Sequence, residues 1–400
     1  MMGWGANQFP PLIVLYEHRL GLTDAVLNGV FGLYALGLIP ALFIGGRLSD
    51  RIGRRPVVSV SLAISAAGTC LLILGGHAVA ALVVGRALSG VANGLAFGTG
   101  AAWVGELSRT TRDVGAGARR ATVAMTIGFC AGPFVSGICA QWVPAPTVVP
   151  YLPHLVLLAI AAYAVRRAPD PHRIVSGATK PDMVPASPRP AVARVFLLVL
   201  IPFSPWVFGT AAIALAYLPT LIAPDVAGHA MAFSAVSTGI TALAGIVVQP
   251  LIRRGYRPGS ARLLMVSMAA VVVSIGAAAW AAELRSPSLV LVASALLGGA
   301  YGVTQFCGLA EVQQAVPARS LGTATAAYQI LAYLGFAFPF LLSITTAHTG
   351  YSPTALLLVV ALFAVVVSAW LAVITYCERS RRGVTPGPGT PVRAADAGYE

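Results

Sequence analysis

Long apolar segments alternate with short polar loops along almost the entire chain. Because a helix needs roughly 20 mostly apolar residues to cross a bilayer, this pattern predicts about twelve membrane-spanning helices. The predicted spans are 3–19, 26–46, 57–76, 79–105, 118–142, 149–167, 194–222, 228–251, 260–282, 288–311, 321–346 and 353–377. We therefore predict an all-α integral membrane protein.

The first of these segments is short for a membrane span. Residues 3–19 form about 17 residues or roughly 25 Å of helix. They include the polar pair Asn7 and Gln8 and the adjacent prolines Pro10 and Pro11. The polar lead expected before a first membrane helix is also missing. We therefore expect the native chain to start upstream, so that this first helix is truncated.

Composition agrees with a membrane protein. Soluble domains carry about 25% charged residues, whereas this chain is 10% charged and 57% hydrophobic. The net charge of +13 comes from basic residues in short loops, not from a groove with interleaved aromatic residues, which argues against nucleic acid as a partner. The five cysteines show no paired spacing and predict neither disulfides nor a metal site.

The basic residues also predict the orientation in the membrane. If the arginine-rich loop 47–56 lies in the cytosol, every Lys and Arg is cytosolic except Arg19, Arg86 and Arg285. The positive-inside rule favours this orientation. We therefore predict a multi-pass protein of a bacterial plasma (inner) membrane with both termini in the cytosol.

A proline-rich connection divides the predicted spans into two equal groups. Residues 168–193 predict a cytosolic linker, between an N-terminal six-helix bundle (1–167) and a C-terminal six-helix bundle (194–377). Residues 378–400 predict a disordered cytosolic tail. The two halves repeat weakly, since 87–94 resembles 295–302 and 46–56 has a worn counterpart at 249–258. Two pseudo-symmetric halves indicate a secondary transporter with its site between them.

Several motifs resemble those of the major facilitator superfamily. Its loop signature G-x-x-x-D-R/K-x-G-R/K-R/K is filled by Gly46, Asp50, Arg51, Gly53, Arg54 and Arg55. The fourth predicted helix is similar to the family's R-x-x-Q-G pattern, with Arg86 and Gly90 in place and Ser89 where Gln is usual. The fifth is similar to an element of proton-coupled drug and metabolite exporters, with Gly128, Gly132, Pro133 and Gly137 in place and Ser136 at a glycine position.

The loop signature allows two interpretations. Its arginines could simply anchor the topology, with glycines permitting the turn. The resemblance implies instead a gating latch, in which Asp50 pairs with a nearby arginine or a helix N-terminus and holds the halves shut on the cytosolic side. A mere anchor needs neither Asp50 nor Gly53, so we favour the latch.

Other residues allow a functional and a structural interpretation as well. Arg86, a charge within a span, is a candidate for coupling or substrate binding, or snorkels to the headgroups. Gly128, Gly132, Pro133 and Gly137 form a hinge in helix 5 or a close-packing face. The coupling or central residues we select are Arg86, Gly90, Asn93, Glu106 and Glu311. The cavity candidates, each of which could instead be a packing residue, are Asn7, Gln8, Tyr34, Trp206, Gln305, Tyr328, Gln329 and Tyr333.

The carboxylates fall near the predicted loops and not at mid-membrane. If protons drive transport, Glu17, Glu106, Glu311 or His154 must carry them. The sequence contains no phosphate-binding loop, metalloprotease motif or nucleophile–base pair, so we predict no enzyme, cofactor or metal. The prediction is a monomeric transporter working by alternating access, best as a proton-coupled exporter of a hydrophobic compound. Uptake of a sugar or organic metabolite, and a non-transporting sensor, are the alternatives.

Overall fold

The computed structural model describes residues 1–108, 116–169, 194–226, 228–255, 262–316 and 321–383, and these residues are helical without any strand. Ten of the described helices are long and apolar enough to cross a membrane. The other two predicted spans correspond to α6, whose described apolar part is Ile127–Trp142, and to the interrupted segment at the start of the chain. The segments predicted as linker and tail lie largely outside the described residues.

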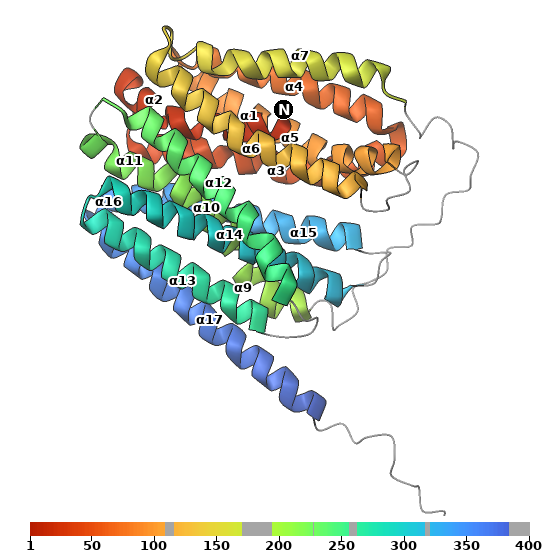
Figure 1. Cartoon of the computed structure of the whole chain (residues 1–400), viewed down its shortest axis with the longest axis vertical. Helices are drawn as coiled ribbons and strands as arrows, with labels where there is room; N and C mark the ends of the chain where they lie inside the picture. Colours follow the sequence, from red (N-terminus) through yellow and green to blue (C-terminus); the bar gives the residue numbers. More distant parts are fainter. Residues whose placement is uncertain (109–115, 170–193, 227, 256–261, 317–320, 384–400) are drawn as a thin grey trace, which may run out of the picture.

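The first half begins with an interrupted helix followed by five longer ones. Its elements are α1 (Met2–Asn7), η1 (Pro10–Leu12), α2 (Ile13–Leu20), α3 (Asp24–Ile52), α4 (Arg54–Leu74), α5 (Val79–Leu107), α6 (Ala116–Trp142), η2 (Val149–Tyr151) and α7 (Leu152–Arg167). Figure 1 shows them gathered in one group, with α3, α4 and α5 packed on one another.

The second half forms the other group in Figure 1. Its elements are η4 (Phe196–Leu200), α9 (Ile201–Phe203), α10 (Pro205–Ala212), η5 (Ile213–Tyr217), α11 (Leu218–Ile222), η6 (Ala223–Val226), α12 (Ala230–Gly255), α13 (Arg262–Glu283), α14 (Pro287–Ala315), α15 (Leu321–Tyr333), η8 (Leu334–Ala337), α16 (Phe338–Thr349) and α17 (Pro353–Gly383). Helix α17 continues past Cys377, so the helical part of the chain extends into the segment predicted as a disordered tail.

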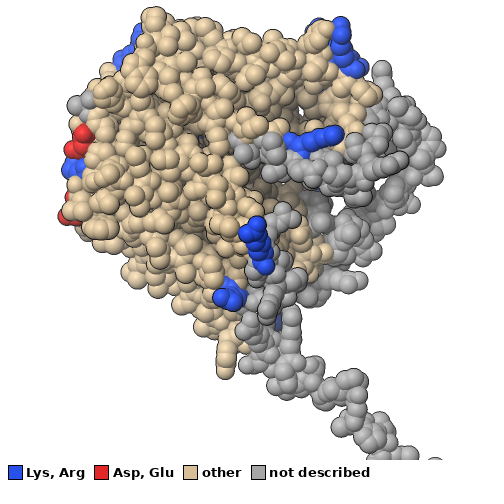
Figure 2. Space-filling view, in the orientation of Figure 1, with Lys and Arg blue, Asp and Glu red and all other residues tan. Residues whose placement is uncertain are grey.

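The two ends of the molecule differ in charge. Most described arginines lie where α3, α7 and α12 end and where α4, α6 and α13 begin, and we call this the basic end. Figure 2 shows most of its visible Arg side chains toward this end, while the Asp and Glu side chains visible in this view lie at the other side, next to further Arg side chains. At the opposite end, Arg285 forms an ion pair with Asp225 at 2.8 Å. This pairing raises the pKa of Arg285, because the Asp225 carboxylate accepts its hydrogen bonds and stabilises its charge.

The two halves meet near the opposite end. Asn28 of α3 donates a hydrogen bond to Ser343 Oγ of α16 at 2.9 Å. Gln141, near the end of α6, donates to Gly228 O at 2.5 Å and accepts from Ala232 N at 3.3 Å. The Gln141 amide thereby caps the first turn of α12, whose N–H groups lack partners within the helix. Helices α3 and α16, and α6 and α12, are thus paired across the halves.

Candidate functional site

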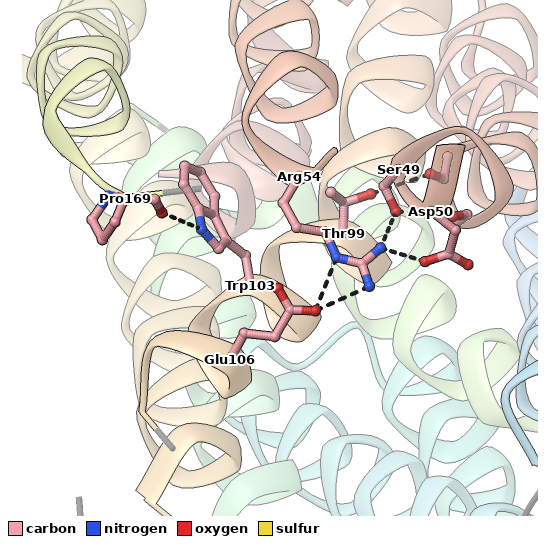
Figure 3. Close-up of polar contacts among 9 residues, drawn as sticks. Ser49, Asp50, Arg54, Thr99, Trp103, Glu106 and Pro169 are labelled. Carbon is pink, nitrogen blue, oxygen red and sulfur yellow. Dashed lines mark hydrogen bonds and ion pairs between the residues drawn. The ribbon is translucent and has the colours of Figure 1, made fainter. Parts of the chain in front are cut away.

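The loop between α3 and α4 is reduced to a single residue. Gly53 has φ 97° and ψ 164°, a conformation that side chains with a Cβ rarely adopt, and α4 begins at the next residue. Arg54 consequently points back toward the end of α3 and toward α5 (Figure 3). Its Nη1 donates to Ser49 Oγ at 2.7 Å and Asp50 Oδ1 at 2.5 Å, while Nε and Nη2 donate to Glu106 Oε1 at 3.2 and 3.1 Å.

Arg54 rather than Asp50 is the centre of this network. The Arg54 side chain is 16% exposed and that of Glu106 24%, whereas that of Asp50 is 67% exposed. The described contacts connect α3, α4 and α5, which all belong to the first half. The latch was expected to join the two halves, so these contacts do not by themselves close the basic end. Glu106, predicted as a central residue, lies in this network.

The neighbouring residues fasten α7 to the same end. Arg55 Nη2 donates to the carbonyl of Arg166. Trp103 Nε1 of α5 donates to Pro169 O at 3.1 Å (Figure 3). The other loop residues differ, because Arg51 is exposed and a Cβ on Gly46 would meet no atom within 4 Å. The structure gives no steric reason for glycine at position 46.

Arg86 lies fully buried inside the first half. Pro10 has no N–H, so the carbonyl four residues earlier, Ala6 O, loses its partner within the helix. Arg86 Nη1 donates to this carbonyl at 3.0 Å. Its Cζ also lies 4.6, 5.1 and 5.5 Å from the ring centres of Tyr34, Phe9 and Phe31, distances at which a cation is attracted by an aromatic face. The side chain therefore does not snorkel to a surface.

Tyr34 brings three predicted residues together. A Cβ on Gly90 would lie 2.1 Å from Tyr34 O, so only glycine allows α3 and α5 to approach this closely. Asn93 lies on the same face of α5 as Arg86 and interacts with the Tyr34 hydroxyl. Tyr34, Arg86, Gly90 and Asn93 thus form one cluster. Glu311 lies apart from them, near the basic end of α14.

Aromatic rings continue from this cluster into the second half. The ring of Phe336 lies 5.2 Å from Phe31 and 5.9 Å from Tyr34. On its other side it lies 5.3 Å from Phe208, which stacks on Tyr333 at 4.4 Å. We call these rings the aromatic layer, which consists of Phe31, Tyr34, Phe208, Tyr301, Tyr333 and Phe336. Only Tyr34 and Tyr333 were candidates, because nothing in the sequence links α3 to η8.

The remaining cavity candidates are distributed over the two halves. Gln305 of α14 donates to Gln329 Oε1 of α15 at 3.3 Å. Tyr328 donates to Thr304 O at 3.5 Å. Trp206 packs on Phe338 and Phe363 within the second half.

In the first half, Gln8 is buried against His154, with Gln8 Nε2 3.2 Å from His154 Nδ1, and its carbonyl accepts from Ser136 Oγ at 2.6 Å. Asn7 ends α1 and is half-buried.

The small residues of α6 pack closely on two different partners. A Cβ on Gly128 or Gly132 would lie 3.0 Å from Trp4 N or 2.7 Å from Trp4 O in α1, and one on Gly137 would lie 2.4 Å from Ala235 Cβ in α12. Pro133 lies inside α6 between these contacts. Gly128 and Gly132 therefore pack within the first half, and Gly137, on another side of α6, packs at the contact between the halves.

Comparison with known proteins agrees with this architecture. The family described as Major Facilitator Superfamily matches residues 1–339. The multidrug resistance protein MdtL of Klebsiella pneumoniae (strain 342) is 35% identical over 78 residues, which is 20% of either chain. The inner membrane transport protein YajR of Escherichia coli (strain K12) is 37% identical over 83 residues, which is 20% of this chain and 18% of YajR. The matched segments thus span about a fifth of these relatives.

Solved structures share the fold over nearly the whole chain. The nucleoside transporter NupG has a TM-score of 0.70 at 14% identity and covers 93% of this chain and 96% of its own. A POT family transporter in complex with 5-aminolevulinic acid has a TM-score of 0.73 at 12% identity, with 94% of both chains covered. A D-xylose-proton symporter has a TM-score of 0.67 at 15% identity, with 92% of this chain and 94% of its own covered. The chain belongs to the Major Facilitator Superfamily.

Proposed function

We propose that this chain exports a small hydrophobic compound across the bacterial plasma membrane in exchange for protons. As a superfamily member it is a multi-pass membrane transporter of a small molecule and not an enzyme. By the positive-inside rule the basic end and both termini lie in the cytosol. The opposite end then faces outward, and the protein works as a monomer.

The observation that carries this proposal is the aromatic layer between the halves. Phe336 touches Phe31 and Tyr34 of the first half and Phe208 of the second. Ligand sites in proteins are mostly apolar and aromatic, with a few polar groups that fix orientation. The aromatic layer contains rings from both halves. The Gln305–Gln329 pair lies one helical turn from Tyr301 in α14 and from Tyr333 in α15. This combination suits a hydrophobic compound with few polar groups.

The contacts across the halves also support a stage of alternating access. Asn28 and Gln141 bind the second half near the opposite end, which in our orientation closes the outward side. Asp50 is largely exposed, and its ion pair in the described part of the chain is with Arg54 of its own half. We propose that this loop network is the latch in its released state, and that Asp50 gains a partner in the second half when the basic end closes.

Uptake of a sugar is the second candidate within transport. A site for a sugar needs many hydrogen-bonding side chains around the ligand, because a polar group buried without a partner is costly. The described centre instead presents mainly phenyl and phenol rings, so we favour the hydrophobic substrate. The sensor alternative predicts no transport at all.

Reconstituted vesicles test the proposal. A panel of fluorescent or radiolabelled hydrophobic compounds and sugars is offered to proteoliposomes with an imposed pH gradient of either sign. We expect accumulation of a hydrophobic compound that reverses when the gradient is reversed and stops when it is collapsed. Sugar uptake with the same dependence would favour the second candidate, and no flux of any compound would favour the sensor.

A further inference from the structure

The guanidinium of Arg86 uses only part of its hydrogen-bonding capacity. The side chain is 0% exposed, and Nη1 donates to Ala6 O. The Nε and Nη2 atoms are buried and have no hydrogen-bond partner. No carboxylate in the described part of the chain forms an ion pair with Arg86. The three surrounding rings offset part of the cost of burying this cation, but they leave its N–H donors unsatisfied.

The two unpartnered nitrogens form one edge of the guanidinium plane. The N–H bonds of Nε and Nη2 run parallel along this edge, and their spacing matches the two oxygens of a carboxylate. The remaining nitrogen, Nη1, donates to Ala6 O, and this hydrogen bond fixes the orientation of the guanidinium plane. The edge is therefore preorganised for a planar oxyanion and not for a neutral group with a single acceptor.

We propose that this edge of Arg86 binds the carboxylate of the transported compound. The substrate class is then a hydrophobic or aromatic carboxylic acid in its anionic form. This assignment rests on the proposed transport function and names its substrate class. A carboxylate provides both the missing charge and two acceptors, which no described side chain provides at this position.

The cover over Arg86 is also the contact between the halves. Phe31 and Tyr34 lie over the guanidinium and, on their other side, against Phe336 of the second half. When the halves separate at the opposite end, Phe336 moves away and these two rings gain room to turn. An exported compound reaches Arg86 from the cytosol when these two rings turn aside while the opposite end is closed, and it leaves when the halves separate at that end.

The aromatic layer provides the contact for the rest of the molecule. Phe208 and Tyr333 stack at 4.4 Å on the second-half side of Phe336. A ligand whose carboxylate reaches Arg86 directs its apolar part across Phe336 toward this stack. Charge selection then comes from the first half, and apolar contact comes from both.

The test uses the purified full-length protein and pairs of acids and amides of equal shape. Benzoate, 2-naphthoate and 4-phenylbenzoate are compared with their amides, by thermal shift and by inhibition of transport in vesicles. We expect at least one acid to bind tenfold or more tightly than its amide. Arg86→Lys keeps the charge but loses the edge with two parallel N–H donors. In this variant the affinity for the acid should fall at least tenfold, while the affinity for the amide changes little. Arg19→Lys is the matched control, because Arg19 is an exposed arginine of the first half.

Several outcomes would overturn the proposal. These are acids that bind no better than their amides, no binding by any acid, and Arg86→Lys binding acids like the unmodified protein. If acetate or inorganic phosphate raises the thermal stability as much as the aromatic acids do, the site is a general anion site and the proposed substrate class is wrong. The thermal stability of Arg86→Lys without ligand reveals misfolding, in which case the acid–amide preference of the unmodified protein decides.

Failure of this inference can be distinguished from failure of the proposed function. Gradient-driven flux of a neutral compound, with no preference for acids, leaves transport standing and removes the carboxylate. Acid binding that depends on Arg86 without any flux leaves the site standing and removes the transport function.

Discussion

Replacing Arg54 with glutamine removes the charge that links α3, α4 and α5 at the basic end. The substitution leaves Glu106 without its partner and frees Ser49 and Asp50. Asp50→Asn removes only one of the three acceptors. Comparison of the two substitutions therefore shows which residue is central to the network.

The expected magnitudes follow from exposure. Hydrogen bonds to charged groups contribute about 1.5–3 kcal/mol, whereas exposed ion pairs contribute about 0–1 kcal/mol. Glu106 is 24% exposed and Asp50 67%. We therefore expect Arg54→Gln to cost roughly 2–4 kcal/mol and Asp50→Asn less than about 1 kcal/mol. Arg54→Lys should resemble the glutamine variant, because one ammonium cannot reach both carboxylates in this geometry.

Inactivation on heating in detergent provides the measurement. Unfolding of membrane proteins is commonly irreversible, so the rate of loss of monodisperse protein is compared at one temperature. A cost of about 2 kcal/mol corresponds to about 30-fold faster loss if the contacts are broken in the transition state. The double variant with Glu106→Gln should recover about 1–2 kcal/mol of coupling. Asp50→Asn proving as damaging as Arg54→Gln, or zero coupling with Glu106, would refute this reasoning.

Three further predictions follow from close contacts. Gly53→Ala should destabilise the protein by about 1–3 kcal/mol, because the φ of 97° at this position is strained for alanine. Gly46→Ala is the control, since a Cβ at position 46 meets no atom within 4 Å. Equal heat stability of the two variants would contradict the strain. Gln141→Ala should weaken the hydrogen bonds to α12 and make the state that is open at the opposite end several-fold more populated, a change of about 1 kcal/mol. Cysteine accessibility near that end measures this population, and unchanged labelling would count against a role of Gln141 in holding the halves together. Gly132→Leu should abolish folding or transport, because its Cβ alone would lie 2.7 Å from Trp4 O, whereas normal expression and flux would show that α1 can move away.

The positions of the helices were predictable because each span is a nearly continuous apolar run. The run 57–76 corresponds to α4 (Arg54–Leu74), and 353–377 lies within α17 (Pro353–Gly383). Hydropathy gives the part of a helix that lies in the bilayer, not the residue at which the helix ends. Helix α17 accordingly continues past the predicted span and is described as far as Gly383.

The contacts between helices were not predictable from one sequence. Arg54 and Glu106 are 52 residues apart, and Asn28 and Ser343 are 315 apart. The sequence shows the polar residue Asn28 near the start of α3, but it does not show which residue of α16 faces Asn28. The loop motif pointed to Asp50, whose charge is conspicuous in a basic loop. The structure instead places the half-buried Arg54 at the centre of the contacts, and the sequence cannot distinguish it from its neighbours Arg51 and Arg55.

Two irregularities of the sequence turn out to be one feature of the structure. The first span is too short and contains Pro10 and Pro11, and the fourth contains a charge, Arg86. Each alone breaks a rule of membrane helices, because a proline leaves a carbonyl unpaired and a buried guanidinium needs acceptors. The unpaired carbonyl of Ala6 accepts the hydrogen bond of Arg86, so each irregularity satisfies part of the other. What remains unsatisfied after this compensation is the Nε–Nη2 edge, and it is there that a substrate can contribute what the chain does not.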